Sequence, residues 1–261
     1  MGYSGEENRN RILELIYKDG KVETSKLSKE LNVSTESVRR YLESLEKLGK
    51  IKRVYGGAIK LNSYSSEEDI NERYLKNERE KFKIAKVAAE YVKDGDRIII
   101  DEGTTTYQML EFLVNKKNLT IITSSFPLAI GIMNLVNSSK LDCELVFIGG
   151  VVQSGNKRTV GGDAVNMLSN YYADKAFISC EGISIDHGIT AFDTSKAELT
   201  RNYLKHSKES IVMCDYTKIG IRNYYKIDEI FKINKIITNK DIPHEWDIVL
   251  KKWDIEWVKA L

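Results

Sequence analysis

Residues 34–61 read STESVRRYLESLEKLGKIKRVYGGAIKL, and this stretch combines a helical pattern with an alternating one. In its first part, apolar residues recur at intervals of four, three and three, which places them on one face of a helix. That face comprises Val38, Leu42, Leu45 and Leu48. Ser34 can cap the start of the helix and Gly49 can end it, so we expect a helix between these two residues.

The second part of the stretch, residues 50–61, alternates apolar and polar side chains on both sides of Gly56-Gly57. Alternation with a period of two is typical of a half-buried strand, and a Gly-Gly pair between two such runs favours a tight turn. We therefore expect a β-hairpin directly after the helix.

Two shorter helices are expected upstream. A first apolar helical pattern ends before Asp19-Gly20, and Thr24 can cap a second helix, which residues 32–34 join to the third. The inward residues of these helices are Ile12, Leu13, Leu15, Ile16, Leu27 and Leu31. Two short helices joined by a three-residue turn predict a helix-turn-helix, and the hairpin that follows has the position of a wing.

The outward side of the third helix is polar and basic near its N-terminal end, which is the end that enters the major groove in helix-turn-helix proteins. The candidate base-reading residues are Thr35, Glu36, Ser37, Arg39 and Arg40. The candidate phosphate-binding residues of the wing are Lys50, Lys52 and Arg53. An ordinary solvated face is the alternative for each residue alone, but helices, turn and wing together favour binding to double-stranded DNA.

The distribution of charge agrees with this interpretation. Residues 1–61 contain 13 Lys and Arg against 9 Asp and Glu, a net charge of +4, whereas the rest of the chain has a net charge of −2. A basic excess at one end favours a small polyanion-binding module attached to a neutral body.

The remainder of the chain predicts a second, larger domain. Residues 62–69 are polar and Ser-rich, as in a linker, and a long helical pattern over 70–92 is followed by short β-branched runs between helical ones. The runs expected to be strands are 97–100, 120–123, 144–148, 175–178, 210–213 and 235–238. Such strands predict a parallel sheet covered on both faces, and hence an α/β protein with domains at 1–61 and 70–261.

Ligands of parallel sheets bind beyond the carboxyl ends of the strands, where the loops of this chain are rich in glycine and hydroxyl groups. The candidate ligand-binding residues are Asp101, Gly103, Thr104, Thr105, Thr106, Thr123, Ser124, Ser125, Gly149 and Gly150. Basic residues that can add charge are Lys157, Arg158, Lys218 and Arg222. Glycines, hydroxyls and a helix N-terminus suit a phosphate group, and the alternative is a hydroxyl-rich helix cap without a ligand.

With V-R-R at 38–40 and Y-G-G-A at 55–58, the stretch from Arg11 to Leu61 resembles the N-terminal domain of DeoR-family transcriptional regulators. The body resembles the effector domain of the same family through motifs in the same order. These are Asp101, Gly103 to Thr105, Gly149-Gly150, Asp174 to Phe177, Gly182, Gly188, Glu198 and Asp215-x-x-Lys218. The chain departs from the family at Tyr41, where an acidic residue is usual, and at Ser124, where Asn is frequent.

The resemblance implies a C-terminal fold similar to ribose-5-phosphate isomerases and CoA transferases, and a phosphorylated sugar as the effector. On this basis, the loop of Gly103 to Thr105 and residues 123–125 hold the phosphate, while Glu198 and Lys218 face the sugar. We therefore expect a homo-oligomeric repressor of carbohydrate-metabolism genes, with two recognition helices on half-sites related by a two-fold axis.

A sugar-phosphate isomerase with an attached DNA-binding domain is the alternative, because Glu198 and Lys218 are suited to moving a proton and stabilising an enediolate. Isomerases resemble one another in an acidic G-A-D-E run, whereas residues 179–182 here keep a single carboxylate, so we expect no enzyme activity. A purely architectural DNA-binding protein is a third possibility.

Other classes of site are not indicated by the sequence. Cys143, Cys180 and Cys214 lack zinc-type spacing, and the chain has neither a Walker A loop nor a G-x-G-x-x-G motif, so we expect no metal and no cofactor. No apolar run reaches the roughly 18–20 residues that a membrane span needs, and the first residues are too polar for a signal peptide. We therefore expect a cytoplasmic protein.

Overall fold

The computed structural model describes residues 5–19, 21–48, 50–54, 56–60 and 70–261. The chain divides into two compact units, Met1–Ser65 and Ser66–Leu261, each of which has its own hydrophobic core. The predicted linker at 62–69 lies outside the described residues, as do Gly20 and Gly49, for which we predicted the ends of two helices.

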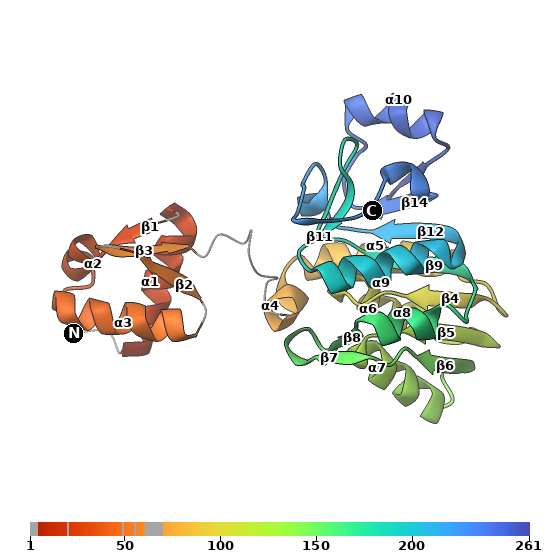
Figure 1. Ribbon diagram of the computed structural model, residues 1–261, viewed down its shortest axis with the longest axis horizontal. Coiled ribbons are helices and arrows are strands. Elements are labelled where there is room, and N and C mark those ends of the chain that lie inside the picture. The colour runs from red at the N-terminus through yellow and green to blue at the C-terminus, as the bar shows by residue number, and fades with distance from the viewer. Residues whose placement is uncertain (1–4, 20, 49, 55, 61–69) are drawn as a thin grey trace. The chain divides into compact units, whose positions relative to one another are not determined.

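The described residues of the first unit form three helices and a small antiparallel sheet, in which the strand order is β1-β3-β2 (Figure 1). Its elements are α1 (Gly5–Asp19), β1 (Lys21–Glu23), α2 (Thr24–Glu30), α3 (Thr35–Lys47), β2 (Ile51–Val54) and β3 (Gly57–Lys60). The predicted helix-turn-helix and hairpin are therefore confirmed. The short strand β1 was not predicted.

Local capping and packing explain why α3 forms where it does. The hydroxyl of Ser34 accepts a hydrogen bond from the backbone N–H of Ser37 at 3.1 Å, which is the predicted cap. Val38, Leu42 and Leu45 are buried as expected, but Leu48 is 64% exposed because it lies at the C-terminal cap, beyond the last turn. The prediction that Thr24 caps α2 is wrong, since Thr24 is the first helical residue and Glu23 precedes it without a side-chain cap.

Close approach of strands explains the Gly-Gly pair in the hairpin. Gly56 has a φ of +80°, a left-handed conformation that favours glycine. A Cβ on Gly57 would collide with the carbonyl oxygen of Val22, because β3 pairs with β1 at this position. The two glycines therefore serve two different purposes, one in the turn and one in the sheet.

The second unit is built on a seven-stranded sheet in which all neighbouring strands are parallel, with the order β15-β14-β12-β9-β4-β5-β6 (Figure 1). The strands are β4 (Arg97–Ile100), β5 (Leu119–Thr123), β6 (Cys143–Phe147), β9 (Ala173–Ser179), β12 (Ser207–Met213), β14 (Lys235–Thr238) and β15 (Glu256–Lys259). All six predicted strands are present, and β15 is an additional edge strand.

Helices cover both faces of this sheet. The helices described in this unit are α4 (Ile70–Leu75), α5 (Glu78–Glu90), α6 (Thr104–Tyr107), α7 (Phe126–Asn137), α8 (Gly162–Leu168), α9 (Thr194–Lys205) and α10 (His244–Lys252). Alternate residues of β4 pack into the cores on opposite faces of the sheet. Ile98 and Ile100 pack with α5 and α7, whereas Ile99 packs with α8 and α9. The single helix predicted over 70–92 is wrong, because Asn77, with a φ of 53°, separates α4 from α5.

Short elements that were not predicted complete the second unit. A three-stranded antiparallel sheet contains β10 (Gly182–Ser184), β11 (Gly188–Ala191) and β13 (Tyr225–Asp228), and a hairpin contains β7 (Val151–Gln153) and β8 (Arg158–Val160). Four 3-10 helices lie at η1 (Gln108–Phe112), η2 (Ser154–Asn156), η3 (Tyr216–Lys218) and η4 (Ile230–Lys232). Within the described parts of the chain, no helix is both long and apolar enough to span a membrane.

Candidate functional site

The N-terminal half of α3 presents the predicted base-reading side chains to solvent. Thr35, Glu36, Arg39 and Arg40 are exposed. Ser37 is half-buried, and its hydroxyl lies 2.9 Å from that of Ser34, so it also takes part in the helix cap. Arg39 forms only a weak ion pair with Glu36, at 3.5 Å between exposed side chains, and so remains available for a ligand.

The hairpin of β2 and β3 is tied to α3 at the position expected of a wing. The backbone N–H of Arg53 donates a hydrogen bond to the Glu46 carboxylate of α3 at 2.8 Å, and the Arg53 side chain is exposed. Lys50 is half-buried, and the side chain of Lys52 lies outside the described part of the structure. Arg53 is therefore the described wing residue best placed to reach a phosphate.

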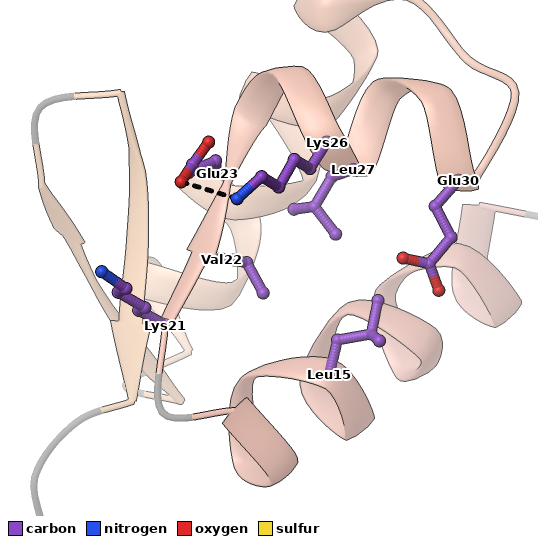
Figure 2. A pocket seen from close by; sticks show the side chains of 7 residues that line it. All are labelled: Leu15, Lys21, Val22, Glu23, Lys26, Leu27 and Glu30. Carbon is purple, nitrogen blue, oxygen red and sulfur yellow. Dashed lines mark hydrogen bonds and ion pairs between the residues drawn. The ribbon is translucent and has the colours of Figure 1, made fainter.

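The first unit contains a pocket whose lining side chains are shown in Figure 2. It is lined by Leu15 of α1, by β1 and by α2, and Lys26 pairs there with Glu23 at 3.0 Å. The pocket mixes acidic, basic and apolar side chains and includes no residue of α3. We assign it no part in DNA binding.

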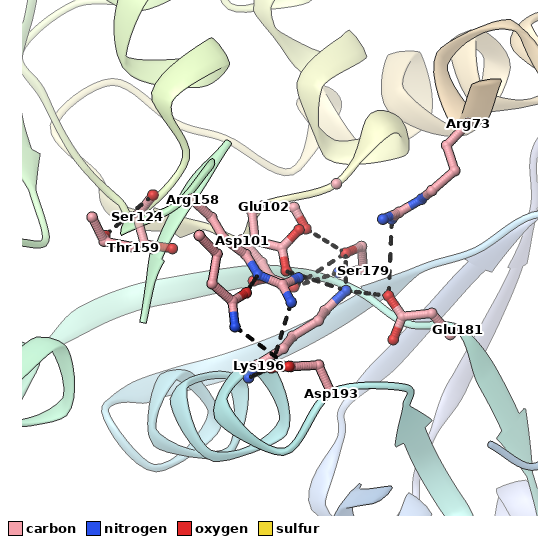
Figure 3. Close-up of polar contacts among 12 residues, drawn as sticks. Arg73, Asp101, Glu102, Ser124, Arg158, Thr159, Ser179, Glu181, Asp193 and Lys196 are labelled. Atoms are coloured by element: carbon pink, nitrogen blue, oxygen red, sulfur yellow. Dashed lines mark hydrogen bonds and ion pairs between the residues drawn. The ribbon is translucent and has the colours of Figure 1, made fainter. Parts of the chain in front are cut away.

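The second unit contains a buried ionic cluster at the carboxyl ends of β4 and β9 (Figure 3). The cluster comprises Asp101, Glu102, Arg158, Ser179, Glu181, Asp193 and Lys196. Figure 3 shows that strands, the β7–β8 hairpin and α9 all contribute side chains to it. Sequence analysis indicated Asp101 as a ligand and Arg158 as a source of charge, but it missed the other members as site residues.

Arg158 connects Glu102, Asp193 and Gln153. Its side chain is 0% exposed, and its guanidinium lies 2.5 Å from the Glu102 carboxylate and 3.5 Å from that of Asp193. Its Nε donates a further hydrogen bond to the Gln153 side-chain oxygen at 2.7 Å. A buried guanidinium requires such partners, because an unpaired charge in the interior is costly.

Lys196 connects Glu181 with Glu102 in the cluster. Its ammonium forms an ion pair with Glu181 and lies 3.4 Å from Glu102, and its side chain is 1% exposed. Asp193 caps α9 by accepting a hydrogen bond from the Lys196 backbone N–H at 2.8 Å. The same cap therefore fixes the start of α9 and directs Lys196 inward.

The two adjacent carboxyl groups of the cluster differ in pKa. Burial raises the pKa of Asp101 to about 8, and the Glu102 charge acts in the same direction. Burial opposes ionisation of Glu102 as well, but Lys196 and Arg158 overcome it and hold the pKa of Glu102 below its usual value. Ser179 donates hydrogen bonds to Asp101 from its backbone N–H and its hydroxyl, both at 3.2 Å. One carboxyl is thus mostly protonated near neutral pH and the other ionised.

Three of the six predicted hydroxyl groups make hydrogen bonds within the protein. The Thr106 hydroxyl donates to the Asp101 carbonyl at 2.7 Å, Thr123 accepts from the Ser125 N–H at 3.1 Å, and Ser125 caps α7. A Cβ on Gly103 would lie 2.5 Å from the Ser179 hydroxyl, so this glycine allows two loops to pack closely. Of these residues Ser125 acts as a helix cap, whereas α6 begins after Gly103 without a side-chain cap hydrogen bond.

Other predicted ligand residues are covered or lie elsewhere. Thr105 and Ser124 are buried, and β8 covers Ser124, whose carbonyl accepts from the Thr159 N–H at 3.0 Å. Gly149 and Gly150 lie by α8, where a Cβ on Gly150 would be 2.7 Å from the Val160 carbonyl. Glu198, which was expected to face the sugar, is on the exposed side of α9 and does not line the pocket described next.

A small pocket adjoins the buried cluster. It is lined by Arg73, Lys76, Asn77, Lys81, Thr104, Cys180, Glu181, Phe192, Asp215, Thr217 and Lys218. Thr104 and Lys218 are therefore the predicted effector residues that the structure brings together. Four basic side chains face two carboxylates here, an excess of positive charge that suits an anionic ligand.

The sequence did not indicate the basic residues of α4 and α5 in this pocket, because the helical pattern over 70–92 carries no signal that marks Arg73 or Lys81 as a site residue. Of the other basic candidates, Lys157 hydrogen-bonds to Asn71 at 3.0 Å and Arg222 is exposed outside the pocket. Across the described ranges, no three or more His, Cys, Asp or Glu side chains are grouped so as to hold a metal ion.

Comparison with known families agrees with this arrangement. A DeoR-like helix-turn-helix domain matches residues 9–64, and the DeoR C terminal sensor domain matches residues 76–240. The chain belongs to the DeoR family of transcriptional regulators. The first unit of this DeoR-family chain is thus its helix-turn-helix domain, and the buried cluster and most of the pocket lie within the matched sensor domain.

Two DeoR-family relatives match most of the chain. The HTH-type transcriptional regulator GolR of Listeria innocua is 32% identical over 90% of this chain and 91% of its own length. The HTH-type transcriptional repressor GlcR of Bacillus subtilis is 32% identical over 90% of this chain and 88% of its own. A solved ribose 5-phosphate isomerase from Methanocaldococcus jannaschii matches 55% of each chain with 19% identity and a TM-score of 0.40, a likeness that carries no functional argument.

Proposed function

We propose that this DeoR-family regulator binds operator DNA as a two-fold symmetric homo-oligomer in the cytoplasm, and that a phosphorylated sugar in the pocket of the second unit controls its affinity for DNA. The name of the relative GlcR, a transcriptional repressor, supports repression as the outcome. The sensor-domain match supports the control by a ligand.

The observation that carries the choice of ligand is the charge of the pocket. Lys218, from η3, faces basic side chains from α4 and α5 across a space that Thr104 also lines. A phosphomonoester carries about two negative charges near neutral pH and accepts several hydrogen bonds. Ammonium and guanidinium groups beside a hydroxyl are suited to such a group, and the carboxylates of Glu181 and Asp215 can accept hydrogen bonds from sugar hydroxyls.

The experiment is a titration of DNA affinity with sugar phosphates. DNA sites are first selected from a random-sequence pool with the full-length protein, and binding is then measured by fluorescence anisotropy at fixed salt. We expect at least one phosphorylated sugar, but not its unphosphorylated form, to change the affinity. If no sugar phosphate in a broad panel changes it, the proposed effector is wrong.

A matched pair of variants places the effect in the pocket. Lys218→Met should raise by about tenfold the concentration of the active sugar phosphate needed to change DNA affinity, because one charge-assisted hydrogen bond to the ligand is lost. DNA affinity without the sugar phosphate should not change. Lys240→Met, which removes an exposed lysine outside the pocket, should respond like the parent protein. Equal responses of the two variants would contradict the assignment of the pocket.

The alternative, a sugar-phosphate isomerase with an attached DNA-binding domain, has less support. Proton transfer between carbons needs a carboxylate within reach of the substrate. Glu198 lies outside the pocket, and Glu181 is paired with Lys196. Turnover of pentose or hexose phosphates that is lost in Glu181→Gln would nevertheless establish the enzyme.

A further inference from the structure

Helix α4 has a special position in the chain. It is the first element described in the second unit, and residues 61–69 connect it directly to β3 of the DNA-binding domain. Arg73 of α4 lines the basic pocket, as do Lys76 and Asn77 of the turn that follows. One wall of the pocket is therefore formed where the chain enters the sensor domain.

Contacts with other elements determine the position of α4. The helix has six residues, which is too short to be stable without tertiary contacts. Ile70 is buried, the ring of Tyr74 packs edge-on against Tyr107 of α6 with centroids 5.3 Å apart, and Asn71 accepts the hydrogen bond from Lys157. Leu75, the last residue of the helix, is 79% exposed.

Two further contacts of α4 involve basic groups of the pocket. The Arg73 guanidinium lies 3.9 Å from the Glu181 carboxylate, near the outer limit for an ion pair. Figure 3 shows this pair beside the buried cluster. Lys81 of α5 is 5% exposed, and its ammonium donates a hydrogen bond to the Arg73 carbonyl. Arg73 is therefore part of α4, Lys81 is hydrogen-bonded to α4, and both side chains line the pocket.

An anion in the pocket can change these contacts. Glu181 already has a close partner in Lys196, so Arg73 can turn to a doubly charged phosphate without leaving Glu181 unpaired. The same phosphate can reach Lys81 on α5 and Lys218 on η3, since all three cations line one small pocket. A phosphate that bridges cations from three elements restrains these elements relative to one another.

We infer that α4 is the element through which the pocket acts on the linker: a phosphomonoester bound there is ligated by Arg73 and Lys81 and thereby fixes α4 on the sensor domain. This inference rests on the proposed function, because it uses the same pocket. It goes further in assigning the ligating residues and the element that transmits binding. The free energy available for control is the difference in ligand affinity between the fixed and released positions of α4.

The test is hydrogen exchange of the full-length protein, followed by mass spectrometry, with inorganic phosphate as the probe and chloride at matched ionic strength as the reference. We expect exchange in peptides that contain residues 70–76 to slow on addition of phosphate, while peptides of α10 remain unchanged. The measurement needs no variant, so it does not depend on the folding of a mutant.

Variants then test the residue assignment. Arg73→Met should weaken phosphate binding by about tenfold and abolish the slowing in α4, whereas Arg79→Met, an exposed arginine of α5 outside the pocket, should do neither. Arg73→Lys keeps the charge and should retain part of the slowing of exchange in α4. Slowing that is kept in Arg73→Lys but lost in Arg73→Met would show that the charge at this position is the cause.

The failures of the two proposals can be distinguished. If phosphate raises the melting temperature but exchange in α4 does not slow, the role of α4 is refuted and the effector pocket stands. If neither phosphate nor any sugar phosphate changes the melting temperature, both proposals fail. Slowing that persists in Arg73→Met refutes the assignment of Arg73.

Discussion

Arg158→Met should destabilise the sensor domain strongly. The guanidinium is 0% exposed, lies 2.5 Å from Glu102 and 3.5 Å from Asp193, and donates to Gln153 at 2.7 Å. Methionine fits much of the volume but leaves Glu102 with Lys196, at 3.4 Å, as its remaining described cation. Removing one partner of a buried ion pair typically costs about 3–5 kcal/mol. For a domain of this size, that loss lowers the melting temperature by roughly 6–20 °C.

Tryptophan fluorescence provides the assay. All three tryptophans, Trp246, Trp253 and Trp257, lie in the second unit, so their signal reports unfolding of the sensor domain without a contribution from the DNA-binding domain. The matched control is Lys226→Met, because Lys226 pairs with Glu229 between side chains that are 46% and 41% exposed. Such a surface pair is worth less than about 1 kcal/mol.

A double variant tests the cause of the destabilisation. Glu102→Gln in the Arg158→Met background removes the charge that has lost its partner, so it should restore part of the free energy of unfolding. If Arg158→Met costs no more than Lys226→Met, or if Glu102→Gln makes the variant still less stable, then Arg158 does not neutralise Glu102 as the geometry indicates.

Three further predictions address other parts of the molecule. Burial raises the pKa of Asp101 to about 8 in the folded protein, so the free energy of unfolding should fall as pH rises from about 4 to about 8. Asp101→Asn cannot ionise, so its free energy of unfolding, measured by urea unfolding with tryptophan fluorescence, should depend less on pH over this range. Ser34→Ala removes the α3 cap and should cost about 1 kcal/mol, measured as faster amide exchange in α3. Arg39→Ala should weaken binding to a selected DNA site by about 1–3 kcal/mol and relax its base preference in anisotropy titrations, whereas Lys26→Ala on α2 should leave base preference unchanged.

Hydrophobic periodicity predicted the main sheet because its central strands are continuous apolar runs buried on both faces. Edge strand β15 was missed because Glu256 and Lys259 interrupt its apolar character, and short strands such as β10 and β11 carry too few residues for a periodic signal. The break between α4 and α5 depends on the left-handed backbone of Asn77, for which the helical pattern on either side gives no indication.

The position of the candidate site was predictable, but most of its side chains were not. Parallel strands place their following loops at one edge of the sheet, and this rule indicated Asp101 and Thr104 as candidates at the edge where the cluster and the pocket lie. Charged residues are usually exposed, so nothing in the sequence marks Lys196 and Arg158 as buried. Lys196 and Glu198 are two positions apart on α9 and therefore lie on different faces, and only the Asp193 cap and the packing of the helix decide which of them turns inward.

The position of the cluster bears on whether the pocket senses a ligand or transforms it. A general base must lie within reach of the proton that it accepts from the substrate. Neither Asp101 nor Glu102 lines the pocket, and both are bonded within the cluster, Asp101 to Ser179 and Glu102 to Arg158. The cluster instead stabilises the loops that follow β4 and β9, while other cations, among them Arg73, Lys81 and Lys218, line the pocket. On this proposal the two groups of residues have separable roles: substitution of Arg158 should lower stability, whereas substitution of Lys218 should lower ligand affinity with little effect on the melting temperature of the free protein.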